Sequence, residues 1–206
     1  MCQFNILGKI PRKIILACSG GPDSMAVLDF LIRGKKNVRV AHFDHGTEHG
    51  KEAKNFLTKY CDKRGIPIEV GTISREEKPN NNSWEEWWRN CRYSFFNSLS
   101  HDEPIITCHN LNDAAEWWIF TSLNGNPRLI PYQNGRAFRP FLTTEKNSLT
   151  SWCDRKNVPY MIDPSNLEER FARSRIRNLI MPEALKINPG LLKVLKKKII
   201  AEYCER

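Results

Sequence analysis

Residues 19–24 are Ser19-Gly20-Gly21-Pro22-Asp23-Ser24. The apolar residues 14–18 before this stretch are typical of a buried strand, and the apolar residues 25–32 after it favour a helix packed on a sheet. Two adjacent glycines let the backbone turn sharply and approach an oxyanion closely. Ser24 or Asp23 can lie at the N-terminus of the new helix, where free N–H groups and the helix dipole favour phosphate. The stretch therefore predicts a nucleotide phosphate site between a strand and a helix.

The loop differs from two common nucleotide-binding motifs. No Lys follows its glycines, as a Walker loop requires, and the stretch lacks the G-x-G-x-x-G pattern of Rossmann folds. It resembles the S-G-G-x-D-S pyrophosphate loop (PP-loop) of the ATP pyrophosphatases, which cleave ATP between its α and β phosphates. The resemblance implies that ATP is bound by Ser19, Gly20, Gly21, Asp23 and Ser24. An ordinary strand-to-helix turn with two glycines and a serine cap is the structural alternative.

Composition sets the outer limits. A length of 206 residues fits one domain, and a hydrophobic fraction of 40% can form a core. No apolar run reaches the length of a membrane span, and the first residues lack signal-peptide features, so a cytoplasmic protein is expected. The 7 cysteines contain no C-x-x-C pair, which favours reduced thiols over a zinc ribbon. The net charge of +9 indicates a polyanionic partner.

Strand-like and helical patterns alternate along the first half of the chain. Further strands are predicted at 37–43, 68–73 and 105–108, with helices between them, one of which starts at a capping box of Ser83 and Glu86. The alternation predicts an α/β fold, a parallel sheet with helices on both faces. Ligands of such sheets bind beyond the carboxyl ends of the strands. The glycine loop, His42 and His109 should therefore converge on one crevice.

The pattern changes after Pro127. A hairpin is predicted around Asn134-Gly135, then a helix opened by Thr143 or Thr144, a basic helix that ends near Pro182, and an amphipathic helix at 191–204. The predicted organisation is a PP-loop nucleotide-binding core at 1–127 and, at 128–206, a C-terminal part of the same catalytic domain. No separate tRNA-binding domains are expected after it.

Six elements in the same order resemble the catalytic N-terminal domain of the tRNA(Ile)-lysidine synthetase family. Besides the PP-loop they are His42-Phe43-Asp44-His45-Gly46; Glu85, Arg89, Arg92 and Tyr93; His109, Asp113 and Glu116; Arg139-Pro140-Phe141-Leu142; and Asp163-Pro164-Ser165-Asn166 with Arg173-Ser174-Arg175-Ile176-Arg177. The chain departs from the family pattern at Trp117, where threonine is usual, and at Ser174, which replaces asparagine. The resemblance implies an adenine nucleotide alpha hydrolase-like fold, which is Rossmann-like.

The resemblance also implies a reaction in two steps. ATP adenylates the wobble cytidine of tRNA(Ile) with a CAU anticodon and releases pyrophosphate, and free L-lysine then displaces AMP to form lysidine. Asp23 is expected to hold Mg²⁺ through oxygen. The predicted catalytic residues are Asp23, Arg89, His109 and Arg175, and the predicted RNA contacts are Arg92, Arg173 and Arg177. Charged and solvated helix faces are the plain alternative for any one arginine.

Asp113 and Glu116 are the predicted lysine-binding residues. They lie at i and i+3 on one helix face, where two carboxylates can hold the α-ammonium of an amino acid. By themselves they also fit acidic residues that complement the dipole at a helix N-terminus. Without the family resemblance this second interpretation is preferred, and with it lysine binding is preferred.

Several alternatives stay open from the sequence. Cys18 and Cys108 at strand ends keep a tRNA thiolase in view, and loss of catalysis would leave an ATP- or RNA-binding module. A ligase of the NAD synthetase type shares the loop but lacks the later elements. His42 and His45 are interpreted as a hydrogen-bonding loop without a metal. The aromatic clusters, Trp84, Trp87, Trp88, Trp117 and Trp118, can stack bases or pack in the core. A homodimer is left open.

Overall fold

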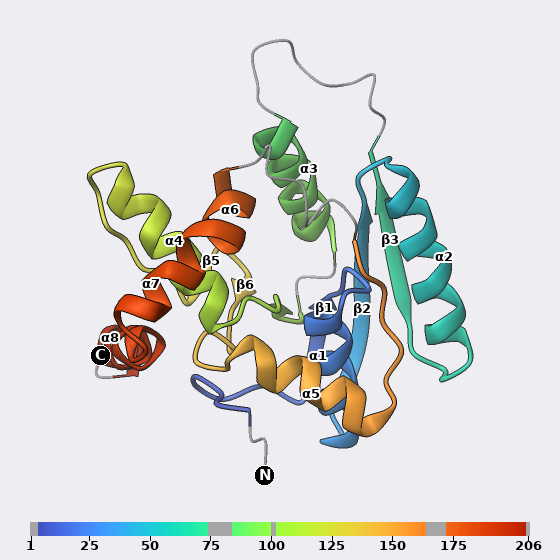
Figure 1. Cartoon of the computed structure of the whole chain (residues 1–206). Helices are drawn as coiled ribbons and strands as arrows, with labels where there is room; N and C mark the ends of the chain where they lie inside the picture. The colour runs from blue at the N-terminus through green and yellow to red at the C-terminus, as the bar shows by residue number, and fades with distance from the viewer. Residues whose placement is uncertain (1–3, 74–83, 100–101, 164–171, 205–206) are drawn as a thin grey trace.

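The computed structural model describes residues 4–73, 84–99, 102–163 and 172–204. A mixed sheet of 6 strands lies at its centre, in the order β3-β2-β1-β4-β6-β5 (Figure 1). The parallel strands are β1 (Lys13–Ala17), β2 (Asn37–Asp44), β3 (Ile68–Thr72), β4 (Ile105–Ile106) and β6 (Ala137–Phe138). The edge strand β5 (Gln133–Asn134) pairs with β6 in the antiparallel direction.

Helices cover both faces of the sheet, as predicted. Along β1 the side chains alternate, so that Ile14 and Leu16 join one buried cluster and Ile15 joins another. The first cluster contains residues of α1 (Pro22–Arg33), α2 (Glu48–Asp62) and α5 (Lys146–Lys156), whereas the second contains residues of α3 (Trp84–Ser98). A third cluster joins α4 (Leu111–Leu123) to the C-terminal helices (Figure 1).

The chain changes direction of travel across the sheet at β1. It leaves β1 for β2 and β3 on one side, and then returns to β4 on the other side of β1. In open α/β sheets, ligands bind in the crevice beyond the carboxyl ends of the two strands at such a switch point. The residues that follow β1 and β4 therefore belong to the expected site.

The C-terminal part continues through consecutive helical segments. They are α6 (Ala172–Arg175), a π-helical turn η3 (Ile176–Ile180), α7 (Met181–Ile187) and, after a short turn, α8 (Leu191–Cys204). Met181 N donates to Ile176 O, five residues back, as in a π-helix. Pro182 lies in the first turn of α7, where a missing N–H costs little.

Most predicted elements are present, and two boundaries were wrong. The basic helix does not end near Pro182, because the π-turn and α7 carry it on to Ile187. Glu145, not Thr143 or Thr144, precedes α5, and both threonine hydroxyls donate instead to Asn5 O at 2.7 Å. The predicted capping box at Ser83 lies outside the described residues. Among the described helices, none is both long and apolar enough to cross a membrane.

Candidate active site

The glycine loop joins β1 to α1, and hydrogen bonds hold it in one conformation. Gly20 has φ +85°, a left-handed value that a side chain would strain. Ser24 Oγ donates to Gly21 O at 3.0 Å and lies 3.3 Å from Ser19 Oγ. Met161 N donates to Gly20 O at 2.9 Å. Gly21 is the N-cap of α1 and no side chain caps the helix, so its first N–H groups point to a ligand site.

Asp23, in the first turn of α1, reaches across to the loop after β4. Its Oδ2 accepts from Asn110 Nδ2 at 3.2 Å, whereas its buried Oδ1 has no hydrogen-bond partner among the described residues. Burial and the nearby Asp113 raise the pKa of Asp23 to about 6, while Lys146 and Arg177 oppose the shift. A carboxylate oxygen left without a partner fits a hard cation such as Mg²⁺, which is commonly held by one carboxylate together with substrate phosphates.

The N-terminus of α4 is held by a reciprocal capping box. Asn110 Oδ1 accepts from the backbone N of Asn112 and of Asp113, and Asp113 Oδ2 accepts from Asn110 N at 2.9 Å. The other oxygen, Asp113 Oδ1, lies 3.7 Å from Arg177 Nη2. Asp113 therefore acts both as a helix cap and as part of the site.

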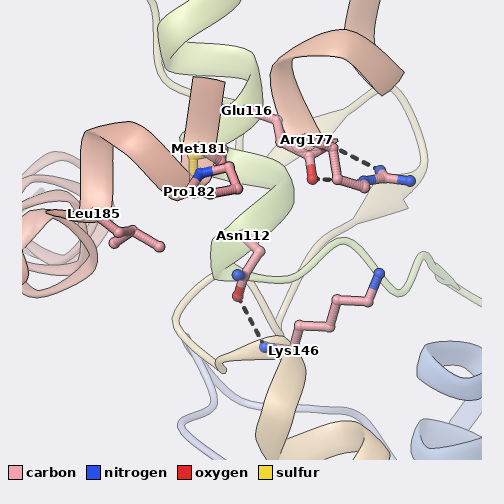
Figure 2. Close-up of a pocket in the computed structure, with 7 residues that line it drawn as sticks. All are labelled: Asn112, Glu116, Lys146, Arg177, Met181, Pro182 and Leu185. Atoms are coloured by element: carbon pink, nitrogen blue, oxygen red, sulfur yellow. Dashed lines mark hydrogen bonds and ion pairs between the residues drawn. The ribbon is translucent and has the colours of Figure 1, made fainter. Parts of the chain in front are cut away.

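Glu116 lies one turn further along α4 and is only 5% exposed. Arg177 from η3 donates to both of its oxygens, Nε to Oε1 and Nη2 to Oε2, each at 2.8 Å (Figure 2). Such a two-point pair fixes both side chains. The structure thus brings together the two predicted lysine-binding carboxylates and joins them to Arg177, for which the sequence predicted an RNA contact.

A cavity of about 290 Å³ lies beside this ion pair. Polar side chains line one part of it and α7 supplies an apolar wall: Asn112, Glu116, Lys146 and Arg177, with Met181, Pro182 and Leu185 (Figure 2). Lys146 N donates to Asn112 Oδ1 at 3.0 Å, and the Lys146 side chain extends away from Asn112. The cavity can hold a chain of methylenes that carries charged groups at its ends.

His109 lies among the arginines of the site, which form its basic side. Its Nδ1 lies 2.9 Å from Thr107 Oγ1. Burial lowers the pKa of His109 to about 3, and Arg139, Arg92, Arg173 and Arg89 lower it further. The imidazole is therefore neutral at physiological pH. The structure brings four predicted residues together here, His109, Arg89, Arg92 and Arg173.

Arg139 is the most buried of these arginines, at 3% exposed. Its Nη1 donates to Pro131 O at 2.6 Å and its Nη2 to Tyr93 Oη at 2.9 Å. The Arg89 guanidinium lies 5.2 Å from the centre of the Tyr93 ring, within cation–π range. Arg175, the remaining predicted catalytic residue, is exposed at the last position of α6.

A model of the PP-loop domain family matches residues 3–184 of this chain. The chain belongs to the PP-loop domain family. A tRNA(Ile)-lysidine synthase of Clostridium tetani is 30% identical over 200 residues, which cover 87% of this chain and 42% of the relative. The bifunctional protein TilS/HprT of Listeria innocua is 29% identical, over 90% of this chain and 31% of the relative. These matches confirm the family resemblance, and the chain spans less than half the length of these relatives.

Solved structures support the fold. A glutamine-dependent NAD+ synthetase of Acinetobacter baumannii superposes with a TM-score of 0.53 at 14% identity, over 95% of this chain and 41% of that one. An NH3-dependent NAD synthetase of Campylobacter jejuni gives a TM-score of 0.51 at 15% identity, over 92% and 85%. The predicted α/β fold class is thereby confirmed.

The structure also shows the surroundings of His42 and of the two cysteines at strand ends. His42 Nδ1 lies 3.0 Å from Cys18 O. Within the described ranges, no three His, Cys, Asp or Glu side chains are grouped so that they could hold a metal. Burial raises the pKa of the Cys18 and Cys108 thiols, the opposite of what a thiolate nucleophile needs.

Sequence reasoning missed two residues of this PP-loop domain. Asn110 links the glycine loop to α4, and the spacing Asn110-x-x-Asp113 is a capping pattern that could have identified it. Lys146 reaches the same crevice from the start of α5. No local signal marks it, because its place depends on how α5 packs against α1.

Proposed function

We propose that this PP-loop domain catalyses the tRNA(Ile)-lysidine synthetase reaction. ATP adenylates the wobble cytidine of tRNA(Ile) with a CAU anticodon, and L-lysine then replaces AMP. The contact between Asp23 Oδ2 and Asn110 Nδ2 carries the proposal, because it joins the glycine loop to the acidic start of α4. Phosphate binding and amino-acid binding then meet in one crevice.

In the first step, the cytidine C2 oxygen attacks the α-phosphorus of ATP and the bond to the β-phosphate oxygen breaks, which releases pyrophosphate. The glycine loop and the first turn of α1 would bind the phosphates through backbone N–H groups and the hydroxyls of Ser19 and Ser24. Asp23 would hold Mg²⁺, which offsets phosphate charge when bound. Arg89 and Arg175 are proposed to stabilise the negative charge of the adenylated intermediate.

In the second step, the lysine ε-amine attacks C2 of the activated base, the C2–O bond breaks, and AMP leaves. The cavity beside α7 supports this assignment. Asp113 and Glu116 would take the α-ammonium of lysine, Arg177 its carboxylate, and the wall of Met181, Pro182 and Leu185 its methylenes. His109, kept neutral by its surroundings, would contact the activated base through hydrogen bonds and not as a cation.

An incorporation assay tests the proposal. Purified protein, ATP, Mg²⁺ and labelled lysine are mixed with tRNA(Ile) that carries a CAU anticodon, and a tRNA without the wobble cytidine is the matched control. Label on the first tRNA alone is the expected result. AMP and pyrophosphate released with RNA but without label would mean that adenylation is right and lysine is wrong. No turnover would favour a binding module that has lost catalysis.

A further inference from the structure

Three rings form a row from the start of α3 to the end of β2. The ring centroids of Trp84 and Trp88 are 5.7 Å apart, and those of Trp88 and His45 are 5.5 Å apart. Both spacings lie in the range of interacting aromatic rings. Trp84 is 42% exposed at the outer end, while His45 directly follows β2 at the inner end. We call these three residues the aromatic row.

The row is fixed to the sheet at its inner end. The ring of Phe43, in β2, meets the His45 ring edge-on, with centroids 5.1 Å apart. Its centroid lies 5.8 Å from that of the Phe95 ring, in α3. Gly71 of β3 allows this close packing, because a Cβ there would lie 2.7 Å from the Phe95 ring. The first half of α3 extends past the carboxyl ends of β1 and β2 (Figure 1). The aromatic row therefore stands beyond the carboxyl end of β2, the strand next to β1.

Three buried polar atoms in or next to the row lack partners within the described part of the chain. The buried indole N–H groups of Trp87 and Trp88, and the buried His45 Nδ1, have no hydrogen-bond partner among the residues that the structure describes. More than nine in ten buried polar groups in native proteins have one. Indole N–H groups donate and a neutral imidazole nitrogen donates or accepts, so the edge of a nucleobase inserted beside the row would supply the missing partners.

The charges around the row suit an RNA strand. Arg92 lies one turn after Trp88 on α3, on the same helix face, and Arg89 lies three residues before Arg92. Burial lowers the pKa of His45 to about 4, and the nearby charge of Arg92 adds to the shift. The other titratable groups that act on this ring are His42 and Asp44. An uncharged His45 ring suits stacking with a base, and arginines attract the phosphates of RNA.

We propose that Trp84, Trp88 and His45 form a stacking platform for one base of the RNA substrate, next to the nucleotide that is modified. The proposal rests on the proposed function, in which RNA is a substrate. The row leads outward from the crevice to an exposed tryptophan. An RNA that places one nucleotide in the crevice continues outward through the neighbouring nucleotides. ATP, in contrast, would lie wholly inside the crevice. The platform thus fits an RNA base better than adenine of ATP.

The test combines variants of Trp84 with RNA that lacks single bases. An anticodon stem-loop of tRNA(Ile), and versions with an abasic site at each loop position, are titrated against wild type, Trp84→Ala, Trp84→Leu and Trp84→Phe. We expect Trp84→Ala and Trp84→Leu to weaken binding about 10-fold and Trp84→Phe less than about 3-fold. One abasic RNA should bind the wild type about 10-fold more weakly than the intact stem-loop does. Trp84→Ala should not weaken the binding of that RNA any further. Leu123→Ala, a change at an exposed apolar residue at the end of α4, is the control that should leave binding unchanged.

Three results would overturn the platform. Unchanged RNA binding by Trp84→Ala removes it, and full recovery by Trp84→Leu reduces the residue to apolar packing. A raised KM for ATP with an unchanged RNA affinity would assign the rings to adenine. The titration contains neither ATP nor lysine, so failure of lysine incorporation with an intact abasic effect would contradict the proposed reaction and leave the platform standing.

Discussion

The acidic and the basic side of the crevice differ in how their charges are balanced. On the acidic side, Arg177 pairs with both Glu116 and Asp113, so that these carboxylates carry a counterion of their own. On the basic side, the buried Arg139 donates to a carbonyl and to the phenol of Tyr93. Neither the Pro131 carbonyl nor the Tyr93 phenol carries a full negative charge. The basic side therefore gains most from an anionic ligand, as a phosphate of RNA or nucleotide would be.

Burial acts on both sides and favours the neutral forms of Asp23 and His109. It raises the pKa of Asp23 to about 6, with Asp113 adding to the shift, and lowers the pKa of His109 to about 3, with four arginines adding to it. Neither group is a strong acid or base as it stands. At pH 7 Asp23 is mostly ionised and a bound cation would stabilise its charge, whereas His109 is neutral in the chain without ligand. The difference favours charge compensation as the proposed role of Asp23 and hydrogen bonding as that of His109.

The largest effect is expected from Asp23→Asn. The amide keeps the shape of the side chain but cannot bind a cation as a carboxylate does, so adenylation should fall about 100-fold or more. ATP–pyrophosphate exchange in the presence of RNA measures this step. Asp29→Asn is the matched control on the same helix, because Asp29 contacts Arg33 and Trp152 instead of the crevice. Wild-type exchange by the Asp23 variant would remove the metal role.

The pH dependence of stability separates the two sides next. From about pH 4 to 6 the folded chain keeps a proton on Asp23 that the unfolded chain has lost, so Asp23 makes stability fall by about 1.4 kcal/mol per pH unit as pH rises. His109 acts with the opposite sign: its contribution is complete above about pH 6.5 and is lost as pH falls toward about 3.

Single variants reveal these opposing slopes. Relative to wild type, Asp23→Asn should make stability rise with pH more steeply by about 1.4 kcal/mol per unit between pH 4 and 6, and it should gain about 3 kcal/mol at pH 7. His109→Gln should change the slope by a similar amount in the other direction. Urea unfolding at several pH values measures both. Parallel profiles for the wild type and the two variants would contradict the burial of these groups.

Glu116→Gln tests the internal counterion. The variant removes the negative charge nearest to the Arg177 guanidinium and should lower stability by about 2 kcal/mol, less than for a fully buried pair because Arg177 is 31% exposed. It should also raise KM for lysine more than KM for ATP. Glu183→Gln, which breaks an exposed pair with Lys186, is the control and should change stability by less than about 0.5 kcal/mol. Equal increases in both KM values would contradict the lysine assignment.

The parts of this molecule that were predictable from sequence are those fixed by local chemistry. The glycines of the loop after β1 predicted the turn into α1, and the period of 191–204 predicted the helix α8. The spacing of Asp113 and Glu116 likewise places them on one face of α4. In each case, the signal and its structural result lie within a few residues of each other.

The parts that were missed depend on packing between distant elements. Arg177 and Glu116 are 61 residues apart, and the π-turn that carries Arg177 has no sequence signature of its own. Lys146 also depends on packing between distant elements, because α5 packs against α1 and so brings Lys146 near Asp23. Pro182 gave a false stop signal, because proline is tolerated in a first helical turn as well as after a helix end.

The smallest expected effect concerns the exposed edge of the basic side. Arg173 lies 5.1 Å from the centre of the Trp117 ring and is exposed, so Arg173→Gln should leave the melting temperature unchanged. If its charge serves a phosphate, RNA affinity should fall only about 3-fold, and the slope of log K against log salt should become shallower by about 0.7–0.9. Titrations of the stem-loop at several salt concentrations measure both. Arg33→Gln, at the far end of α1, should change neither quantity. A loss of affinity with an unchanged salt slope would mean that Arg173 acts through its stacking on Trp117 and not through a phosphate, and the basic side would then owe its RNA affinity to the buried arginines alone.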